Sequence, residues 1–226
     1  MGRDSECPAG NWRGKMTLNI VGDLLETWTA VTKSPAATTY DEVLREVAAR
    51  AEHAHCLSKA DFGALVVWKR LRADTKWAKS LMETPDSRVR QVTHDAWVLA
   101  NDESLSIPRA GRAAQEELWQ LPGCGGSGAV ASAILVALSP GRMAVWDRRA
   151  RESLRAYGRE PSPGNGRYQR YLEIVEELAS DVTERAGGSH AFTPRDIDLS
   201  LYHLAHRVTK DEQGEYDIAP PADGSL

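Results

Sequence analysis

Apolar residues recur three or four positions apart along nearly the whole stretch 16–208, the spacing that places side chains on one face of an α-helix. Only Met143–Trp146 reads as extended, and no stretch alternates apolar and polar residues between hairpin turns. No segment recurs at a fixed period, which argues against a solenoid. We therefore predict an all-α fold of roughly ten helices.

Capping residues indicate where several of these helices begin. A Ser or Thr followed three residues later by Asp or Glu, whose side chains and backbone cap each other, precedes three apolar runs. These predicted capping boxes begin at Thr39, Ser58 and Thr193. Thr84-Pro85 marks another start, because proline is tolerated in a first helical turn. Further helices are predicted over 109–120, 127–138, 147–157 and 167–187, and the helix after Thr193 is expected to run through Val208.

The two ends of the chain lack this periodicity. Residues 1–15 and 209–226 are rich in glycine, proline and charge, and we expect them to be mobile tails. The first of them lacks the apolar core of a secretory signal. The uncharged segment 121–141 is interrupted by a glycine-rich turn and two prolines. No membrane span is therefore expected, and the expected location is cytoplasmic.

Charge and cysteine content exclude further classes. Lys and Arg number 28 and Asp and Glu 32, which gives a formal charge of −4 at neutral pH, so the chain is not a polycation. Cys7, Cys56 and Cys124 lie far apart and lack the paired spacing typical of zinc or iron–sulfur sites. The closely spaced histidines have no acidic or thiol partner in a ligand pattern. Neither a disulfide nor a metal site is expected.

The most informative segment is 118–138, LWQLPGCGGSGAVASAILVAL, which reads as a glycine-rich turn between two helices. Pro-Gly-Cys-Gly at 122–125 forms a tight turn, and the second helix starts near Gly126 or Ser127. Glycine accepts positive φ and lets another backbone approach closely. The unpaired N–H groups at a helix start form a ready anion site. The segment therefore predicts a turn that lies against phosphates.

The Leu-Pro-Gly-x-Gly turn resembles the helix-hairpin-helix element, and more narrowly the helix-hairpin-helix (HhH-GPD) superfamily of DNA glycosylases. In that superfamily an essential aspartate opens the next helix after a short extended loop, and Asp147 stands at that place, after Ala144-Val145-Trp146. At motif level the resemblance covers 118–158. It implies a glycosylase-like helical domain over 16–208, of a divergent kind without the iron–sulfur cluster.

The resemblance also implies a chemistry for Asp147. Breaking the bond between base and deoxyribose builds positive charge on the sugar, and a fixed carboxylate stabilises that oxocarbenium-like state or orients the attacking water. The nucleotide would be flipped into a pocket between the two halves of the domain. Where bifunctional members carry a lysine nucleophile this chain has Ser127. The implied enzyme is therefore a monofunctional glycosylase, which releases a damaged or modified base and leaves the strand uncut.

Double-stranded DNA is the partner that the resemblance implies, bound by a nucleoid-associated monomer without cofactor, although a monovalent cation would fit the hairpin carbonyls. The DNA-contacting residues would be the hairpin and two arginines of the next helix, namely Gly123, Cys124, Gly125, Gly126, Ser127, Arg148 and Arg149. The stretch 142–170 holds eight arginines and three acids, which favours contact with phosphates. Trp68, Lys69 and Trp146 are candidate pocket residues.

Some features depart from the endonuclease III branch of the superfamily. The spacing from the hairpin to Asp147 is longer, the C-terminal four-cysteine cluster is missing, and Gly128 stands where threonine is common. Structural roles also compete with the functional ones. Asp147 stands where a helix begins, and aspartate is a favoured N-cap. Arg148 and Arg149 suit a solvated helix face, and the tryptophans suit a core.

Three hypotheses therefore remain after the sequence has been read. The first is the monofunctional glycosylase. The second is a non-catalytic helix-hairpin-helix DNA-binding protein of the same fold. The third is a small helical interaction protein whose hairpin is only a turn between helices.

Overall fold

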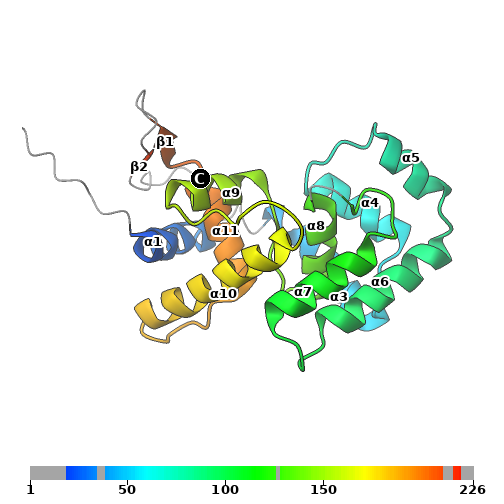
Figure 1. Ribbon diagram of the computed structural model, residues 1–226, viewed down its shortest axis with the longest axis horizontal. Coiled ribbons are helices and arrows are strands. Elements are labelled where there is room, and N and C mark those ends of the chain that lie inside the picture. The colour runs from blue at the N-terminus through cyan, green and yellow to red at the C-terminus, as the bar shows by residue number, and fades with distance from the viewer. Residues whose placement is uncertain (1–18, 35–38, 126–127, 211–215, 220–226) are drawn as a thin grey trace, which may run out of the picture.

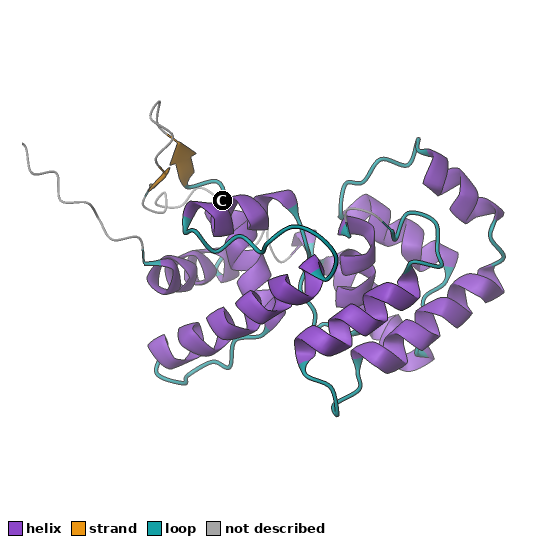
Figure 2. Ribbon diagram, in the orientation of Figure 1, coloured by secondary structure: helices purple, strands orange, loops and turns teal. Residues whose placement is uncertain are grey.

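The computed structural model of the protein describes residues 19–34, 39–125, 128–210 and 216–219. In these ranges it contains ten α-helices and one antiparallel two-stranded sheet, which confirms the predicted all-α fold (Figure 2). The helices are α1 (Ile20–Thr32), α3 (Glu42–Ala54), α4 (Lys59–Trp68), α5 (Lys76–Glu83), α6 (Asp86–Ala100), α7 (Ile107–Leu118), α8 (Ala129–Leu138), α9 (Arg148–Ala156), α10 (Arg167–Arg185) and α11 (Pro194–Leu204). The strands are β1 (Val208–Lys210) and β2 (Tyr216–Ile218).

The helices form two groups, which are in contact where α7 packs on α10 (Figure 1). In the first group, α3, α4, α6 and α7 pack against α8, and every residue of α8 from Ala131 to Leu138 is buried. A helix that is apolar on all sides needs cover on all sides, which explains its central place. In the second group, α11 packs on α1, α9 and α10.

The contact between α7 and α10 is close because Gly111 has no side chain. A Cβ at Gly111 would lie 2.2 Å from Cδ1 of Leu172 on α10, a distance that real Cβ atoms do not reach. This contact fixes how the two groups sit against each other. The segment 139–147, which links α8 to α9, crosses from the first group to the second beside it.

Two of the three predicted capping boxes are confirmed. Ser58 and Thr193 each accept a hydrogen bond at the side-chain oxygen from the backbone N–H three residues on, and the carboxylate of the aspartate at that position accepts one from the backbone N–H of the Ser or Thr. The box predicted at Thr39 is wrong. Helix α3 begins at Glu42, and its N-cap Asp41 makes no capping hydrogen bond. The Asp41 carboxylate is instead drawn into contacts with other helices, described below.

The end of the chain also differs from its prediction. The last helix stops at Leu204, and Val208–Lys210 pairs with Tyr216–Ile218 in register Val208↔Ile218. Ile218 is buried against the core, and the mobility expected for 209–226 stays a prediction. The other predicted tail, 1–15, lies outside the described residues. Within the described ranges, no helix combines the length and the apolar character needed to cross a membrane.

Candidate functional site

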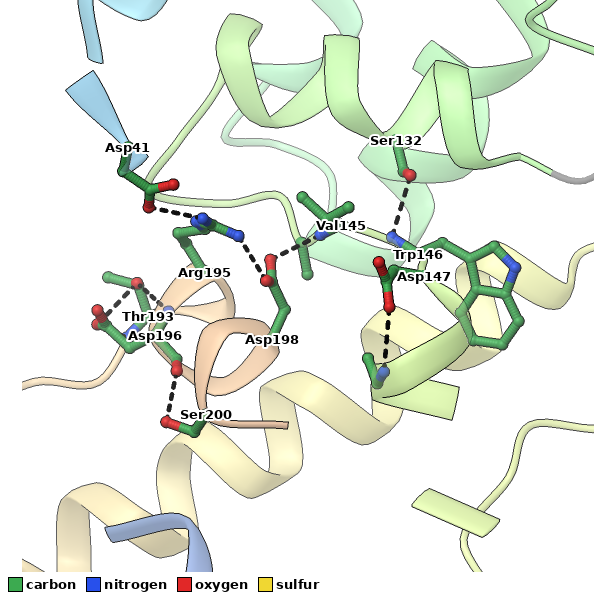
Figure 3. A network of polar contacts seen from close by, with 12 residues as sticks. Asp41, Ser132, Val145, Trp146, Asp147, Thr193, Arg195, Asp196, Asp198 and Ser200 are labelled. Atoms are coloured by element: carbon green, nitrogen blue, oxygen red, sulfur yellow. Dashed lines mark hydrogen bonds and ion pairs between the residues drawn. The ribbon is translucent and has the colours of Figure 1, made fainter. Parts of the chain in front are cut away.

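The extended segment 143–147 is held by side chains from three helices rather than by a neighbouring strand. The N–H groups of residues 145 and 146 donate to Asp198 Oδ2 on α11 (2.7 Å) and to Ser132 Oγ on α8 (3.0 Å) (Figure 3). The carbonyls of residues 144 and 145 accept from the hydroxyls of Tyr168 (2.9 Å) and Tyr171 (3.1 Å) on α10. Four buried backbone groups are thereby paired, and the chain that leads to Asp147 is fixed.

The two carboxylate oxygens of Asp147 have separate partners. Oδ1 caps α9 by accepting from the backbone N–H groups of Arg149 (2.6 Å) and Ala150 (3.3 Å). Oδ2 accepts from Nζ of Lys69, the residue that follows α4, at 2.5 Å. The N-cap role that the sequence suggested is therefore confirmed, and it occupies only one of the two oxygens.

Lys69 also sets the charge state of this carboxylate. Burial alone would raise the pKa of Asp147. The charge and hydrogen bond of Lys69 and the two capping N–H groups outweigh burial and hold the pKa below its ordinary value. Asp147 is therefore an anion at neutral pH, as a group that faces a developing positive charge must be.

A narrow cavity lies where Asp147 meets Lys69, at the boundary between the two helix groups. Its volume is about 30 Å³, room for about one water molecule and well below the range for small-molecule sites. Three aromatic rings, two ion pairs and two small apolar side chains form its walls. The lining residues are Tyr40, Trp68, Lys69, Val145, Asp147, Ala150, Arg195, Asp198 and Tyr202.

A buried network supports another part of the cavity wall. The Arg195 guanidinium donates to Asp198 Oδ1 (2.6 Å) and to Asp41 Oδ2 (2.7 Å) (Figure 3). The Trp68 indole N–H donates to the other Asp41 oxygen (3.0 Å). The network thus joins α4 to α11 across the boundary. Burial raises the pKa of Asp198 to about 6, although the charge of Arg195 acts in the opposite direction.

Trp146 faces away from this cavity. Its ring lines a second and wider pocket, of about 420 Å³, together with Gly128, Arg151 and Arg167. The Arg167 guanidinium lies over the Trp146 ring at 5.1 Å from its centroid. Of the three candidate pocket residues, Trp68 and Lys69 therefore share a cavity with Asp147, and Trp146 does not.

Part of the predicted hairpin packs against the protein. Gly123 has φ +87° and lies so close to Trp77 that a Cβ would be 2.5 Å from its ring. The Cys124 side chain is buried, which raises the pKa of its thiol to about 12, whereas Gly125 is exposed. Gly126 and Ser127 lie outside the described residues. Helix α8 begins at Ala129, two residues later than predicted, behind Gly128 (φ +76°), which offers no side-chain cap.

The arginines of the basic stretch differ in how free they are. Arg148 is 78% exposed and, within the described ranges, is paired with Glu152 alone. Arg149 contacts His206 Nε2 at 2.5 Å and lies over the Tyr202 ring. Three other arginines, Arg151, Arg155 and Arg167, share the carboxylate of Glu160. Arg148 is therefore the better placed of the two predicted phosphate contacts.

The sequence did not single out Tyr40, Asp41, Arg195 or Tyr202 as site residues, and it left open which way Asp198 faces. No local pattern marks them, because their contacts join positions as far apart as Asp41 and Arg195, which are separated by 154 residues. Among the described residues, no three His, Cys, Asp or Glu side chains are placed to hold a metal ion.

Comparison with known proteins identifies no relative. The chain matches no family model, no curated protein and no solved structure.

Proposed function

We propose that this protein binds double-stranded DNA and hydrolyses the N-glycosidic bond of a damaged or modified base, with Asp147 as the catalytic carboxylate. The observation that carries the proposal is that the two carboxylate oxygens of Asp147 have different contacts. Oδ1 is used by the helix start, and Oδ2 is held in a cavity. A capping role accounts for the position of Oδ1, but not for the position of Oδ2 in a cavity between the two helix groups.

The chemistry follows from the charge and the position of this carboxylate. As the base leaves, the deoxyribose becomes cationic, and Oδ2 of a carboxylate whose Oδ1 is fixed by two backbone N–H groups stabilises that charge without having to reorient. Water is the nucleophile in this scheme, and the base departs as in a monofunctional glycosylase. The flipped nucleotide would enter between the two helix groups and would have to widen this cavity, whose aromatic walls include Trp68 and Tyr202.

Contacts with the duplex would come from the exposed backbone at Gly125 and from Arg148 in the first turn of α9, beside Asp147. Arg149 is the second proposed phosphate contact, after release from His206. Phosphate neutralisation by such residues makes binding weaken steeply as salt concentration rises.

One observation favours the non-catalytic alternative. The Lys69 ammonium already neutralises Asp147, so the pair has a role in joining the helix groups even if no reaction occurs. Such a protein would bind duplex DNA with the same salt dependence and release no base.

Base release from a panel of duplexes decides between the two. The panel carries uracil, alkylated, oxidised and hypermodified bases. We expect wild-type protein to release at least one of them, and Asp147→Asn to be slower by about 100-fold or more. Asparagine still caps α9, so the helix start is kept. Release at an equal rate by Asp147→Asn would contradict the proposal.

Asp86→Asn is the matched control for this experiment. Asp86 also accepts from a backbone N–H, that of Lys59, and pairs with a cation, Arg90, but it does not line the cavity. Its rate should equal that of wild-type protein.

A further inference from the structure

The wider pocket beside Trp146 is separate from the Asp147 cavity, and among the described residues the two share no lining side chain. Its volume of about 420 Å³ falls within the range of small-molecule sites. Two helices begin at its wall, α8 behind Gly128 and α10 behind Gly166. Within the described ranges, neither start has a side-chain cap or an acidic residue in its first turn. The positive ends of two helix dipoles, with their unpaired N–H groups, therefore lie at one pocket.

A buried glutamine gives independent evidence for a ligand in this pocket. Gln115 of α7 lines the pocket and is only 8% exposed. Its Nε2 is 3.0 Å from the point where a Cβ on Gly128 would lie, so the amide is placed at the start of α8. No group in the described ranges makes a hydrogen bond with this amide. Because buried amides are normally paired, a bound ligand would supply the missing partner.

The charge of the wall favours an anion. Arg151 and Arg167 line the pocket, and among the described residues no acidic side chain does. Both pair with Glu160, but Arg155 does so too, and three guanidinium groups thus share one carboxylate. This excess of positive charge suits a phosphate monoester, which carries about −1.5 to −2 charges at neutral pH. A phosphodiester within a DNA strand carries only one.

An aromatic ring lies beside this charged wall. Trp119, the C-cap residue of α7, lines the same pocket and is 47% exposed. Nucleobases of every kind stack on such rings. A ring next to an anion site is the combination that a nucleotide requires.

We propose that the wider pocket binds a nucleoside 5′-monophosphate. The phosphate lies between the starts of α8 and α10, where it contacts Arg151, Arg167 and the Gln115 amide, and the base stacks on Trp119. The ligand is either a free nucleotide or the 5′-phosphorylated end of a DNA strand. Binding here does not require base release at Asp147, so either proposal can fail without the other.

Isothermal titration calorimetry of the full chain tests the pocket with three probes, dAMP, deoxyadenosine and inorganic phosphate. We expect dAMP to bind at least about tenfold more tightly than either of the others, because each of them lacks one of the two groups that the pocket holds. No binding of dAMP, or equal affinity for dAMP and one of the smaller probes, would overturn the proposal.

Arg151→Gln and Arg155→Gln form a matched pair of variants. Both residues share Glu160 and have similar exposure, 34% and 43%, and each change removes one positive charge. Only Arg151 lines the pocket. Arg151→Gln should weaken dAMP binding by at least about tenfold, and Arg155→Gln by less than about threefold. Equal losses would show that the ligand senses only the general charge of this face.

Gln115→Leu separates a ligand contact from a structural role. Because the amide has no partner in the described part of the protein, its loss should leave urea denaturation unchanged. The affinity for dAMP should nevertheless fall by about tenfold, the effect of one lost hydrogen bond to a charged group. Unchanged affinity in this variant would contradict the placement of the phosphate.

Competition identifies the source of the nucleotide. A short single strand with a 5′-phosphate and the same strand with a 5′-hydroxyl are each added to protein that is saturated with dAMP. Displacement by the phosphorylated strand alone supports the proposal with a strand end as the ligand, and displacement by neither supports it with a free nucleotide. Equal displacement by both strands would overturn the requirement for a terminal phosphate.

Discussion

Side chains on the two faces of the segment 143–147 line two pockets that differ in how their charges are paired. Val145 and Asp147 face the narrow cavity, where each charged side chain of the lining has a partner of opposite sign. Trp146, between them, faces the wider pocket, whose lining includes Arg151 and Arg167 and, among the described residues, no acid. Successive residues of an extended chain point to opposite sides, so one short segment serves both.

The comparison shows that charged side chains can be paired inside the protein, as in the cavity, or remain accessible to a ligand, as in the wider pocket. In the cavity the pairs are buried and neutralised, which suits a group that must hold one position during a reaction. In the wider pocket the arginines share Glu160, which is 22% exposed, and they reach solvent. The first arrangement is rigid and the second is open to an anion such as phosphate.

The largest effect expected to distinguish the cavity from the wider pocket is on the free energy of unfolding. Asp198→Ala should lower the free energy of unfolding by about 3–5 kcal/mol, because Arg195 loses a buried partner and the Val145 N–H loses its acceptor. Glu160→Ala, the matched change beside the wider pocket, should cost about 1 kcal/mol, since its arginines can turn to water. Urea denaturation followed by circular dichroism measures both. Equal losses would remove the distinction between the two faces.

A smaller effect concerns pH. Burial, with the nearby charges of His206 and Arg149, lowers the pKa of His203 to about 4 from an ordinary 6.5. Between pH 4 and pH 6.5, the His203 imidazole therefore binds a proton in the unfolded chain but not in the folded protein. Stability from this group is therefore present above pH 6.5 and is lost as the pH falls toward 4.

His203→Gln isolates this contribution. Between pH 6.5 and 4, wild-type protein should lose about 1–2 kcal/mol more unfolding free energy than the variant, a value reduced for the partly exposed ring. The same urea titration at several pH values measures it. Parallel pH curves for the two proteins would show that His203 does not titrate between folded and unfolded states.

The smallest effect is on DNA affinity. Arg148→Ala should reduce the slope of log K against log salt concentration by about 0.9, the value for one lost phosphate contact, and weaken duplex binding only several-fold. Arg72→Ala is the control, because Arg72 is equally exposed, at 81%, and pairs with Asp74 away from the cavity. Fluorescence anisotropy with a labelled duplex gives both slopes, and identical slopes would exclude Arg148 as a phosphate contact.

Sequence patterns predicted the structure correctly where it depends on contacts between residues that are close together in the chain. The box of Ser58 with Asp61 forms as predicted because both partners lie in one helical turn. The box at Thr39 does not form because α3 begins only at Glu42, behind Asp41, whose carboxylate is engaged by Trp68 and Arg195 from other helices. Helix α5 was not predicted, since it is only eight residues long and has a single fully buried residue.

The candidate site was likewise predictable only where local patterns indicate its residues. A motif and its spacing indicated Asp147, and the end of α4 was a candidate for the pocket through Trp68 and Lys69. The ion pair between Lys69 and Asp147, however, depends on how two helix groups pack, which no short pattern encodes. Trp146 was grouped with Trp68 and Lys69 as a candidate pocket residue, whereas its ring lines the other pocket, because successive residues of the extended segment 143–147 point to opposite sides.

Binding to two abasic-site analogues tests the central claim, that Asp147 stabilises a cationic sugar, without knowledge of the base. One duplex carries a pyrrolidine, which is cationic, and the other a tetrahydrofuran, which is neutral. Wild-type protein should bind the pyrrolidine duplex at least about tenfold more tightly, or about 1.4 kcal/mol, and Asp147→Asn should bind both alike. Equal affinities in wild-type protein, or a preference that survives in Asp147→Asn, would contradict the account.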